Sequence, residues 1–310
     1  MADNPLFRIG TRGSPLALTQ TQEAEDRLKA AHPPLAESGA LEVVVITTTG
    51  DRVTDRALAD IGGKGLFAKE IDEALLNGRI DFGVHSMKDL ETRLADGIVL
   101  GAVLEREDPR DVFISPKARS LDELPPGSVI GSASVRRQAQ ILHRRPDLRV
   151  VTFRGNVATR LRKLEAGDVD ATLLALAGLR RLDMADAATQ ILEPDQFLPA
   201  VGQGAIGITC RGGDTGILEI LDAINHPPSA TRVTAERAML AALDGSCRTP
   251  IGGLAEIAGN GDLTLRGLVA RPDGSELIDT TQSGPSADAE NLGRAVGEEL
   301  RERAGPNFFE

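Results

Sequence analysis

The chain has 310 residues with 41% hydrophobic and 26% charged side chains, the length and balance of a globular protein with two or three domains. A formal net charge of −11 argues against nucleic-acid binding through a broad basic surface, and no run of about 20 apolar residues predicts a membrane span. Two cysteines and the absence of a secretory leader favour a reducing cytoplasm.

The first hundred residues alternate between segments typical of strands and of helices. Residues 6–11 predict a short strand, and Ser14 can cap a following helix that has Pro15 at its first position and stops before His32. The β-branched run 41–47 predicts a buried parallel strand. The other expected elements are a helix with the apolar stripe Phe67, Ile71, Ala74 and Leu75, closed by Gly78, and strands over 80–84 and 98–104.

A second α/β region begins near Pro109. Ser134 and Asn156 are candidate N-caps of two helices in it. Residues 205–210 predict a strand that returns to the first, mostly parallel sheet, so the chain would cross twice between two domains and form a hinge beside a cleft. The strands expected in the second region are 112–114, 129–131, 149–153 and 171–174.

The chain changes character after His226. A helix over 229–243 precedes strands that turn at Asn260-Gly261 and at 272–274, and a helix over 287–303 closes the chain. We therefore expect the α/β class, with two α/β domains and a small α+β third domain. The expected boundaries are 1–104 with 205–222 for a discontinuous first domain, 110–198 for the second and 227–310 for the third.

Cys247 lies in a loop of turn residues, Asp244 to Gly253, and not in an apolar run. The neighbouring Arg248 favours its thiolate form, so Cys247 has the setting of an attachment point or a nucleophile. A small buried residue is the ordinary alternative for a cysteine. Cys210 fits that alternative, because it lies in an apolar strand where we expect it to be buried and inert.

Arginines gather beside glycine or serine turns near the ends of predicted strands. In an acidic protein this placement predicts a site for a small polyanion, because guanidinium groups bind carboxylates through paired, charge-assisted hydrogen bonds. A solvated basic face is the alternative for any one arginine, and it fits Arg144-Arg145. The arginines assigned to the anion site are Arg136-Arg137, Arg154, Arg160 and Arg180-Arg181.

The cysteine loop and the segment His85-Ser86-Met87-Lys88-Asp89 together resemble the porphobilinogen deaminase family. The resemblance continues in order along the chain from about Phe7 to the last helix, and it is therefore far more specific than one short motif. The other matching stretches are Thr11 to Ala17, Gly62 to Phe67, Glu107 to Asp111, Gly131 to Gln138, Arg154 to Arg160 and Leu198 to Gly204.

This resemblance implies a fold of three domains, of which the first two are similar to type II periplasmic binding proteins. It also implies a transferase of tetrapyrrole (porphyrin, heme, chlorophyll) biosynthesis that condenses four porphobilinogen molecules head to tail, with release of ammonia, into hydroxymethylbilane. The family grows its chain on a dipyrromethane cofactor, which Cys247 would hold by a thioether. The implied partners are porphobilinogen and the growing polypyrrole chain, with no nucleic acid, no membrane and no metal, in a monomer.

Residue by residue, the resemblance implies a role for Asp89 as the catalytic carboxylate. Its charge would accept pyrrole N–H hydrogen bonds and stabilise a transient cation. His85 is expected to be structural, and Gln203 to support the hinge. The implied cofactor contacts are Cys247, Lys88, Asp89, Ser132, Ser134, Arg136, Arg137, Arg160 and Gly178. The implied substrate contacts are Arg12, Ser14, Arg154, Arg160 and Arg181.

The segment 51–65 has charge, glycine and little periodicity, which favours a mobile lid over the cleft, in which Lys64 would touch ligand carboxylates. The chain departs from its relatives at Asp60, where they can carry Lys, and at Glu91, where they usually have Pro, so the turn after Asp89 is expected to be less rigid. Two other functions stay open at this point. A non-catalytic anion-binding protein would explain the arginines but not Cys247, and a cysteine hydrolase would need a histidine base beside Cys247.

Overall fold

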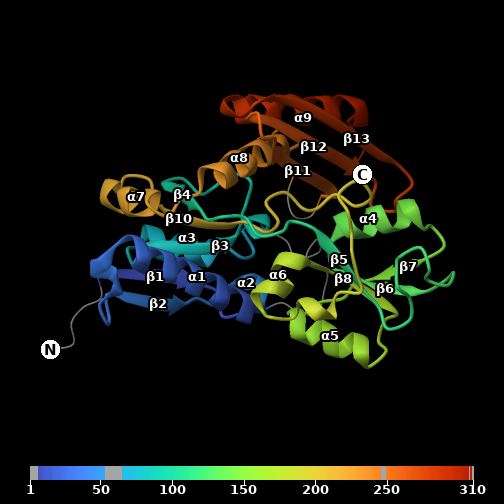
Figure 1. Ribbon diagram of the computed structural model, residues 1–310, viewed down its shortest axis with the longest axis horizontal. Coiled ribbons are helices and arrows are strands. Elements are labelled where there is room, and N and C mark those ends of the chain that lie inside the picture. Colours follow the sequence, from blue (N-terminus) through green and yellow to red (C-terminus); the bar gives the residue numbers. More distant parts are fainter. Residues whose placement is uncertain (1–5, 53–64, 246–248, 307, 309–310) are drawn as a thin grey trace. The chain divides into compact units, whose positions relative to one another are not determined.

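The computed structural model describes residues 6–52, 65–245, 249–306 and 308. These residues form two compact units, which are described separately (Figure 1). Unit 1 comprises 6–52, 65–107 and 205–230, and unit 2 comprises 108–204 with the described residues from Thr231 onward. No helix in these stretches is long and apolar enough to cross a membrane. The three-domain boundaries expected from the sequence stay a prediction.

Unit 1 contains a five-stranded mixed sheet in the order β2-β1-β3-β10-β4. Strands β1 and β2, and β1 and β3, pair in parallel, whereas β10 pairs antiparallel with both β3 and β4. The predicted return of a late strand to the first sheet is thus confirmed, and the prediction of a mostly parallel sheet holds for every strand but β10. The strands are β1 (Phe7–Thr11), β2 (Leu41–Val45), β3 (Phe82–Ser86), β4 (Ile98–Val103) and β10 (Ile206–Arg211).

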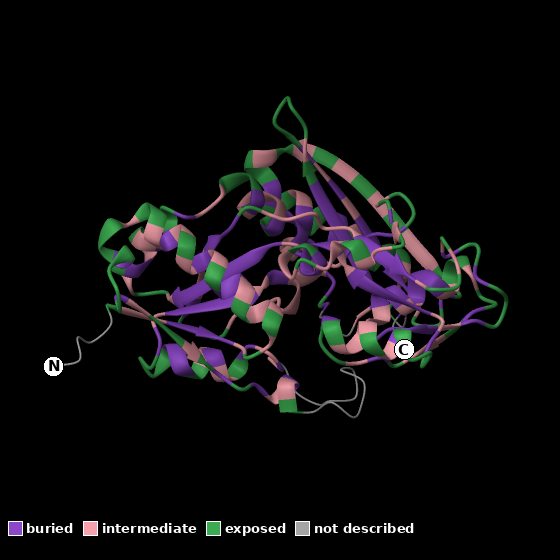
Figure 2. Cartoon of the chain, turned by 60° about the horizontal axis from the view of Figure 1, so that its bottom comes forward, coloured by how far each residue is buried: buried purple, intermediate pink, exposed green. Residues whose placement is uncertain are grey.

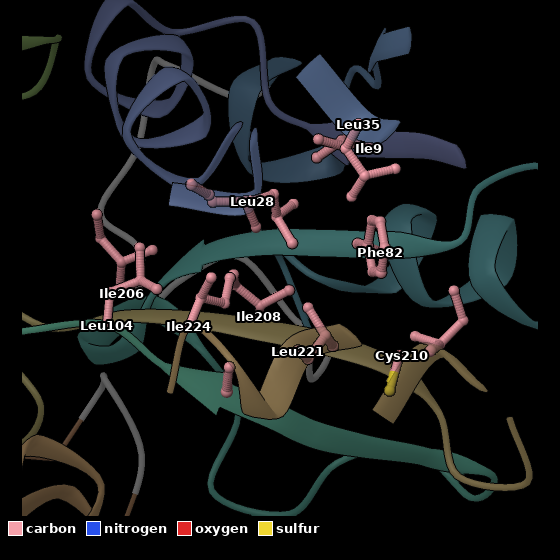
Figure 3. Packing of buried hydrophobic residues seen from close by; sticks show 14 residues of the cluster. Ile9, Leu28, Leu35, Phe82, Leu104, Ile206, Ile208, Cys210, Leu221 and Ile224 are labelled. Carbon is pink, nitrogen blue, oxygen red and sulfur yellow. The ribbon is translucent and has the colours of Figure 1, made fainter. Parts of the chain in front are cut away.

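The first helix of unit 1 begins at Pro15 and ends before His32, as the sequence predicts. Helices at 49–52 and 215–222 were not predicted. Ser14 caps the first helix by accepting a hydrogen bond from the Ala17 N–H at 3.3 Å. Apolar side chains from helices and strands meet in one cluster that includes Leu28, Phe82, Ile208 and Leu221 (Figure 3). The helices are α1 (Pro15–Ala31), α2 (Thr49–Arg52), α3 (Lys69–Leu76) and α7 (Thr215–Asp222), with 3-10 turns η1 (Pro33–Ala36) and η3 (Met87–Asp89).

Two details of unit 1 differ from the sequence prediction. The strand expected to be buried, β2, is the edge of the sheet, and Val43 and Val45 are 37% and 53% exposed. A β-branched run favours a strand by its side-chain shape even where only one neighbour covers it, so the composition alone cannot place it centrally. Phe67 precedes α3 instead of joining its stripe, because the chain turns at Gly65 before the helix begins.

Unit 2 contains a second five-stranded sheet with the same pattern, in the order β7-β6-β8-β5-β9. Here β5 is the strand that runs antiparallel to both neighbours. Ser134 and Asn156 cap their helices as predicted. The strands are β5 (Asp111–Ile114), β6 (Val129–Gly131), β7 (Arg149–Val151), β8 (Ala171–Ala175) and β9 (Gln190–Ile191). The helices are α4 (Val135–Arg144), α5 (Val157–Glu165) and α6 (Leu176–Arg181), with the 3-10 turn η4 (Ala185–Ala187).

The rest of unit 2 is an antiparallel three-stranded sheet with helices, as expected from the two turn signals. Gly293 and Gly297 let the last helix approach α8 closely, since a Cβ on either would lie within 2.6 Å of α8 backbone oxygens. Most strands are coloured as buried in Figure 2, whereas the helices alternate buried and exposed positions. The elements are α8 (Pro227–Ala242), β11 (Ile251–Ile257), β12 (Asp262–Ala270), β13 (Leu277–Pro285), η5 (Ser286–Asp288) and α9 (Ala289–Ala304).

Candidate active site

In unit 1, the predicted residues Arg12, Ser14 and Asp89 line one small cavity of about 50 Å³. Its position follows from the topology: β1 and β3 are parallel neighbours, so their carboxyl ends meet at one edge of the sheet. Arg12 directly follows β1, and Asp89 ends the 3-10 turn that follows β3. The other lining residues are Leu16, Ala17, Gln20, Phe67, Val84, His85 and Ser86.

The Arg12 guanidinium has three neighbours within this site. Its Nε donates to both oxygens of Asp51 at 3.2 Å, and its Nη2 donates to Asp51 Oδ1 at 2.5 Å. The Phe67 ring covers it at 4.1 Å from the ring centre. Its Nη1 lies 4.0 Å from Asp89 Oδ2. A guanidinium with one edge on an internal carboxylate and the other toward the cavity is suited to orient an incoming carboxylate.

His85 is structural in this arrangement, as the sequence analysis expects. Its ring is buried, and Nε2 lies 3.0 Å from Thr209 Oγ1. Burial, and then the nearby positive charge of Arg12, lower the pKa of His85 to about 4. The imidazole is therefore neutral near pH 7 and does not supply a cationic acid to the cavity.

Three further residues belong to this site although the sequence did not predict them: Gln20, Ser86 and Asp51. The Ser86 hydroxyl donates to Gln20 Oε1 at 2.9 Å, and Gln20 is 5% exposed. A buried glutamine on a helix face that otherwise carries Ala24 and Leu28 was the available signal, because buried amides need a polar partner. Asp51 gave no such signal, since an aspartate in a glycine-containing loop is ordinary.

In unit 2, the ends of the parallel strands β6, β7 and β8 form the corresponding edge. Ser132 follows β6 directly, and the Ser134 hydroxyl caps α4 by accepting from the Arg137 N–H at 3.4 Å. Arg154 follows β7, and Gly178 lies in the helix after β8. Parallel neighbours end at one edge, so the cofactor contacts predicted for this half of the chain share that edge.

Arg136 and Arg137 are buried and share one carboxylate, Asp111. Arg136 Nη2 lies 2.8 Å from Asp111 Oδ2, and Arg137 Nη2 lies 2.6 Å from Oδ1. Gln203 Nε2 donates to Asp111 Oδ1 at 2.9 Å, which joins the predicted hinge segment to the same cluster. Burial opposes the ionisation of Asp111, but the two guanidinium charges outweigh it and lower the pKa of Asp111 far below its usual range.

This cluster fits a group with several carboxylates. Two guanidinium cations balanced by one carboxylate leave one buried positive charge, and Arg136 Nε is a buried donor with no partner among the described residues. An unsatisfied buried donor costs about 1–3 kcal/mol, and a charged one costs more, so a ligand carboxylate that reached this cluster would be stabilised by it. The dipyrromethane cofactor implied by the family resemblance would carry four carboxylates and supply such oxygens.

The remaining predicted residues are placed less closely. Arg160 Nε donates to the Gly155 carbonyl at 3.0 Å, and Arg181 Nη1 donates to the Gly204 carbonyl at 3.1 Å. Lys88 lies in the same 3-10 turn as Asp89. Cys247, Lys64 and Asp60 lie outside the described residues. Within the described stretches, no group of three or more His, Cys, Asp or Glu side chains is arranged to hold a metal ion.

Cys210 has the inert character expected of it. It is fully buried in β10 as a free thiol. Burial, and then the charge of Asp214, raise the pKa of Cys210 to about 11. It stays protonated near pH 7, so it is a poor nucleophile.

The chain matches two known sequence families over most of its length. Residues 7–219 match the porphobilinogen deaminase dipyromethane cofactor binding domain, and residues 230–302 match the porphobilinogen deaminase C-terminal domain. Similar proteins include the chloroplastic porphobilinogen deaminase of Oryza sativa subsp. japonica, 58% identical over 98% of this chain and 86% of the relative. The porphobilinogen deaminase of Nitrobacter winogradskyi is 57% identical over 98% of this chain and 95% of the relative.

The solved structures that are similar to this chain include binding proteins. The methionine-binding protein MetQ is 14% identical with a TM-score of 0.45, covering 70% of this chain and 89% of that one. A periplasmic substrate-binding protein of an ABC transporter from Coxiella burnetii is 14% identical with a TM-score of 0.43, covering 74% and 96%.

Proposed function

The chain belongs to the porphobilinogen deaminase family, and from this membership we propose how its own side chains serve the family's reaction. The protein is a transferase of tetrapyrrole biosynthesis that condenses four porphobilinogen molecules head to tail, with release of ammonia, into hydroxymethylbilane. Its cofactor is dipyrromethane, which supplies the nucleophilic pyrrole end on which the product grows. The attachment of that cofactor to Cys247 is part of the proposal.

We assign catalysis to Asp89. Its carboxylate lines the unit 1 cavity beside Arg12, Ser14 and Ser86, where a pyrrole would meet both an anion and hydrogen-bonding groups. A carboxylate at this place accepts a pyrrole N–H and stabilises positive charge that develops in the ring during ammonia loss. It also takes up and returns a proton at its Oδ atoms. The position of Asp89 in the cavity is the observation that carries this assignment.

The cationic residues bind the carboxylates of the two ligands. Arg12 and Ser14 receive an acetate or propionate of incoming porphobilinogen, and Arg154, Arg160 and Arg181 serve the substrate and later rings. The cofactor carboxylates go to the unit 2 edge, where Arg136 and Arg137 carry one positive charge more than Asp111 offsets. The residues assigned to the cofactor are Cys247, Lys88, Asp89, Ser132, Ser134, Arg136, Arg137, Arg160 and Gly178.

Intact-mass measurement of the purified protein tests the attachment site. The expected mass exceeds that of the sequence by one two-pyrrole group, and Cys247→Ser is expected to lose that excess. An anion-binding protein or a cysteine hydrolase would show the bare sequence mass. A wild-type protein that converts porphobilinogen with an unmodified thiol at position 247 would contradict the proposal.

Asp89→Ala tests the catalytic assignment. We expect the variant to fold and to keep its cofactor, because Asp89 is more than one-third exposed, while kcat falls by at least about 100-fold through loss of the charge that stabilises the cation. Turnover of porphobilinogen and intact mass are the two measurements. Asp96→Ala, which removes an exposed carboxylate of the same unit, is the control and should retain full activity. Substantial activity in Asp89→Ala would overturn the assignment.

We also propose that the protein acts as a monomer in the cytoplasm. The free thiol of Cys210 is compatible with a reducing compartment. Light scattering coupled to size-exclusion chromatography tests the monomer, for which the expected mass is 32.8 kDa plus the cofactor. A stable dimer at micromolar concentration would contradict it.

A further inference from the structure

Asp51 is held in place independently of Arg12. Its Oδ2 accepts a hydrogen bond from the Thr48 hydroxyl at 2.7 Å, and the Thr48 N–H lies 3.3 Å from the same oxygen. Thr48 is fully buried, so it is a fixed support. Burial opposes ionisation, but the hydrogen bonds from Arg12 and Thr48 outweigh it and lower the pKa of Asp51. The carboxylate is therefore charged across the physiological range.

The contacts of Arg12 are divided between its two edges. Nε and Nη2 are directed to Asp51, and the Phe67 ring covers one face of the guanidinium plane. Nη1 lies on the side of Asp89 and is the atom left for a ligand in the cavity. A planar guanidinium fixed along one edge has a single orientation for its other edge, and its binding geometry is set before the ligand arrives.

We propose that Asp51 is a positioning residue for substrate binding, because it fixes the Arg12 guanidinium so that Nη1 meets one carboxylate of porphobilinogen beside Asp89. This inference rests on the proposed function, since it takes Arg12 as a substrate ligand. Asp51 also occupies the Nε–Nη2 edge, which would otherwise attract any small anion. The Arg12–Asp51 pair therefore favours the binding of a carboxylate on a correctly placed pyrrole over the binding of free inorganic anions.

The anchoring by Thr48 favours positioning over competition. A carboxylate that competes with the substrate for Arg12 has to leave when the substrate binds. Asp51 instead has a second set of hydrogen bonds to a buried residue, and these would be lost on departure. If Asp51 competed with the substrate for Arg12, Asp51→Asn would lower KM for porphobilinogen, whereas positioning predicts a higher KM. The KM of this variant therefore distinguishes the two roles.

Asp51→Asn removes the charge with little change of shape. We expect KM for porphobilinogen to rise about tenfold or more with kcat within about threefold of wild type, because a misplaced binding group can cost up to about 100-fold. We also expect inorganic phosphate to inhibit the variant at least about threefold more strongly than wild type, because the positive charge of Arg12 is no longer neutralised along its Nε–Nη2 edge. A purely structural role for Asp51 would not change phosphate inhibition.

Asp214→Asn is the matched control. Asp214 pairs with Arg211 at 3.2 Å in the same unit, with a side-chain exposure of 33% against 24% for Asp51, and it lies outside the cavity. Asn at this position still accepts the Ile217 N–H as the N-cap of α7, so the helix keeps its cap. We expect KM and phosphate inhibition to match wild type in this control.

Thr48→Val keeps Asp51 but removes its hydroxyl support, and we expect a smaller rise in KM in the same direction. This variant keeps the test decisive where Asp51→Asn does not fold. Unchanged KM in Asp51→Asn, or in a folded Thr48→Val when Asp51→Asn does not fold, overturns the inference. A KM below wild type would indicate competition and overturn it as well. Failure of the proposed function is distinguishable, because wild type itself would then not convert porphobilinogen.

Discussion

Asp72 is a carboxyl group that the fold of unit 1 leaves poorly compensated. It lies in the first turn of α3, and its Oδ1 is buried without a hydrogen-bond partner among the described residues. Burial, and then the negative charge of Glu91, raise the pKa of Asp72 to about 6. Glu91 itself accepts the Gly65 N–H at 2.6 Å, so Glu91 adds a hydrogen bond after Asp89 and a repulsion with Asp72.

The pH dependence of stability tests the charge on Asp72. Because folding raises the pKa of Asp72 from 3.8 to about 6, its protonated carboxyl group contributes to the free energy of unfolding. This contribution is fully present below pH 3.8 and is lost as the pH rises through 6. We expect Asp72→Asn to raise Tm relative to wild type at pH 8, with a gain of about 1 kcal/mol in the free energy of unfolding after allowance for solvent screening. At pH 5, between the two pKa values, the gain should be about half as large, because the unfolded chain has already lost the Asp72 proton that the folded protein keeps. Thermal unfolding at both pH values is the measurement.

Glu73→Gln is the control for this prediction. Glu73 is exposed on the same helix, where it pairs with Lys69 at 3.9 Å. Surface pairs of this kind contribute little, so the variant should follow wild type at both pH values. An Asp72→Asn gain that is equal at pH 5 and pH 8 would show that packing, and not charge, is responsible.

At the residue level, the sequence indicates which of the proposed ligand contacts lie together better than it indicates the groups that support them. Arg12, Ser14 and Asp89 follow strand ends, and they do share one cavity. Asp51 and Asp111 could not be assigned to Arg12 and to the Arg136-Arg137 pair, because each carboxylate is brought to its arginine by tertiary folding. No local rule connects residues that lie 39 positions apart, as Arg12 and Asp51 do.

The helix that starts after Asn156 illustrates how a local signal sets an element. The Asn156 side chain accepts the Thr159 N–H at 2.8 Å and caps α5, which carries Arg160 in its first turn. The first turn of a helix lacks internal partners for its N–H groups, so a capping oxygen stabilises it. The cap therefore also fixes the backbone from which Arg160 projects.

Asn156→Ala is expected to lower the free energy of unfolding by about 1 kcal/mol through loss of this cap. The corresponding fall in Tm is about 2–4 °C for a unit of this size. Asn156→Ser keeps a capping oxygen and should stay close to wild type. Calorimetric unfolding of the three proteins gives the comparison, and equal stability of the Ala and Ser variants would refute the role of the cap.

Elements with strong end signals are predicted to within about two residues, and the short ones are missed. The caps at Ser14, Ser134 and Asn156 are confirmed. The two-residue strand β9 and the six-residue helix α6 were not predicted, because they are too short to show a period. The exposure of β2 could not be predicted from the sequence either, because it depends on which strand lies at the edge of the sheet.

For the molecule as a whole, the two five-stranded sheets differ in how their sequence is distributed. Sheet β7-β6-β8-β5-β9 is built from one continuous stretch, residues 111–191. The sheet of unit 1 needs β10, which is placed between β3 and β4 although it follows β4 by about a hundred residues. Its core cluster likewise includes Ile206, Ile208 and Leu221 from the late segment.

A shortened variant tests whether unit 1 depends on this late segment. The Leu104 N–H donates to the Ile206 carbonyl at 3.0 Å, so a short Gly–Ser linker can join Glu107 to Ala205. We expect residues 1–107 linked to 205–230 to unfold cooperatively on heating, and residues 1–107 alone to lack a cooperative transition, because β3 and β4 then have no strand between them. Cooperative unfolding of 1–107 alone would contradict this.

The late strand also has a consequence for folding during synthesis. The ribosome delivers every strand of the sheet β7-β6-β8-β5-β9 before it delivers Ile206. That sheet can therefore be complete while the sheet of unit 1 still lacks its fifth and last strand, β10. During that interval the edges of β3 and β4 are open to other chains. Slow translation between residues 191 and 211 would prolong this exposure, and a chaperone that binds nascent strands would find its substrate in the N-terminal part of the chain.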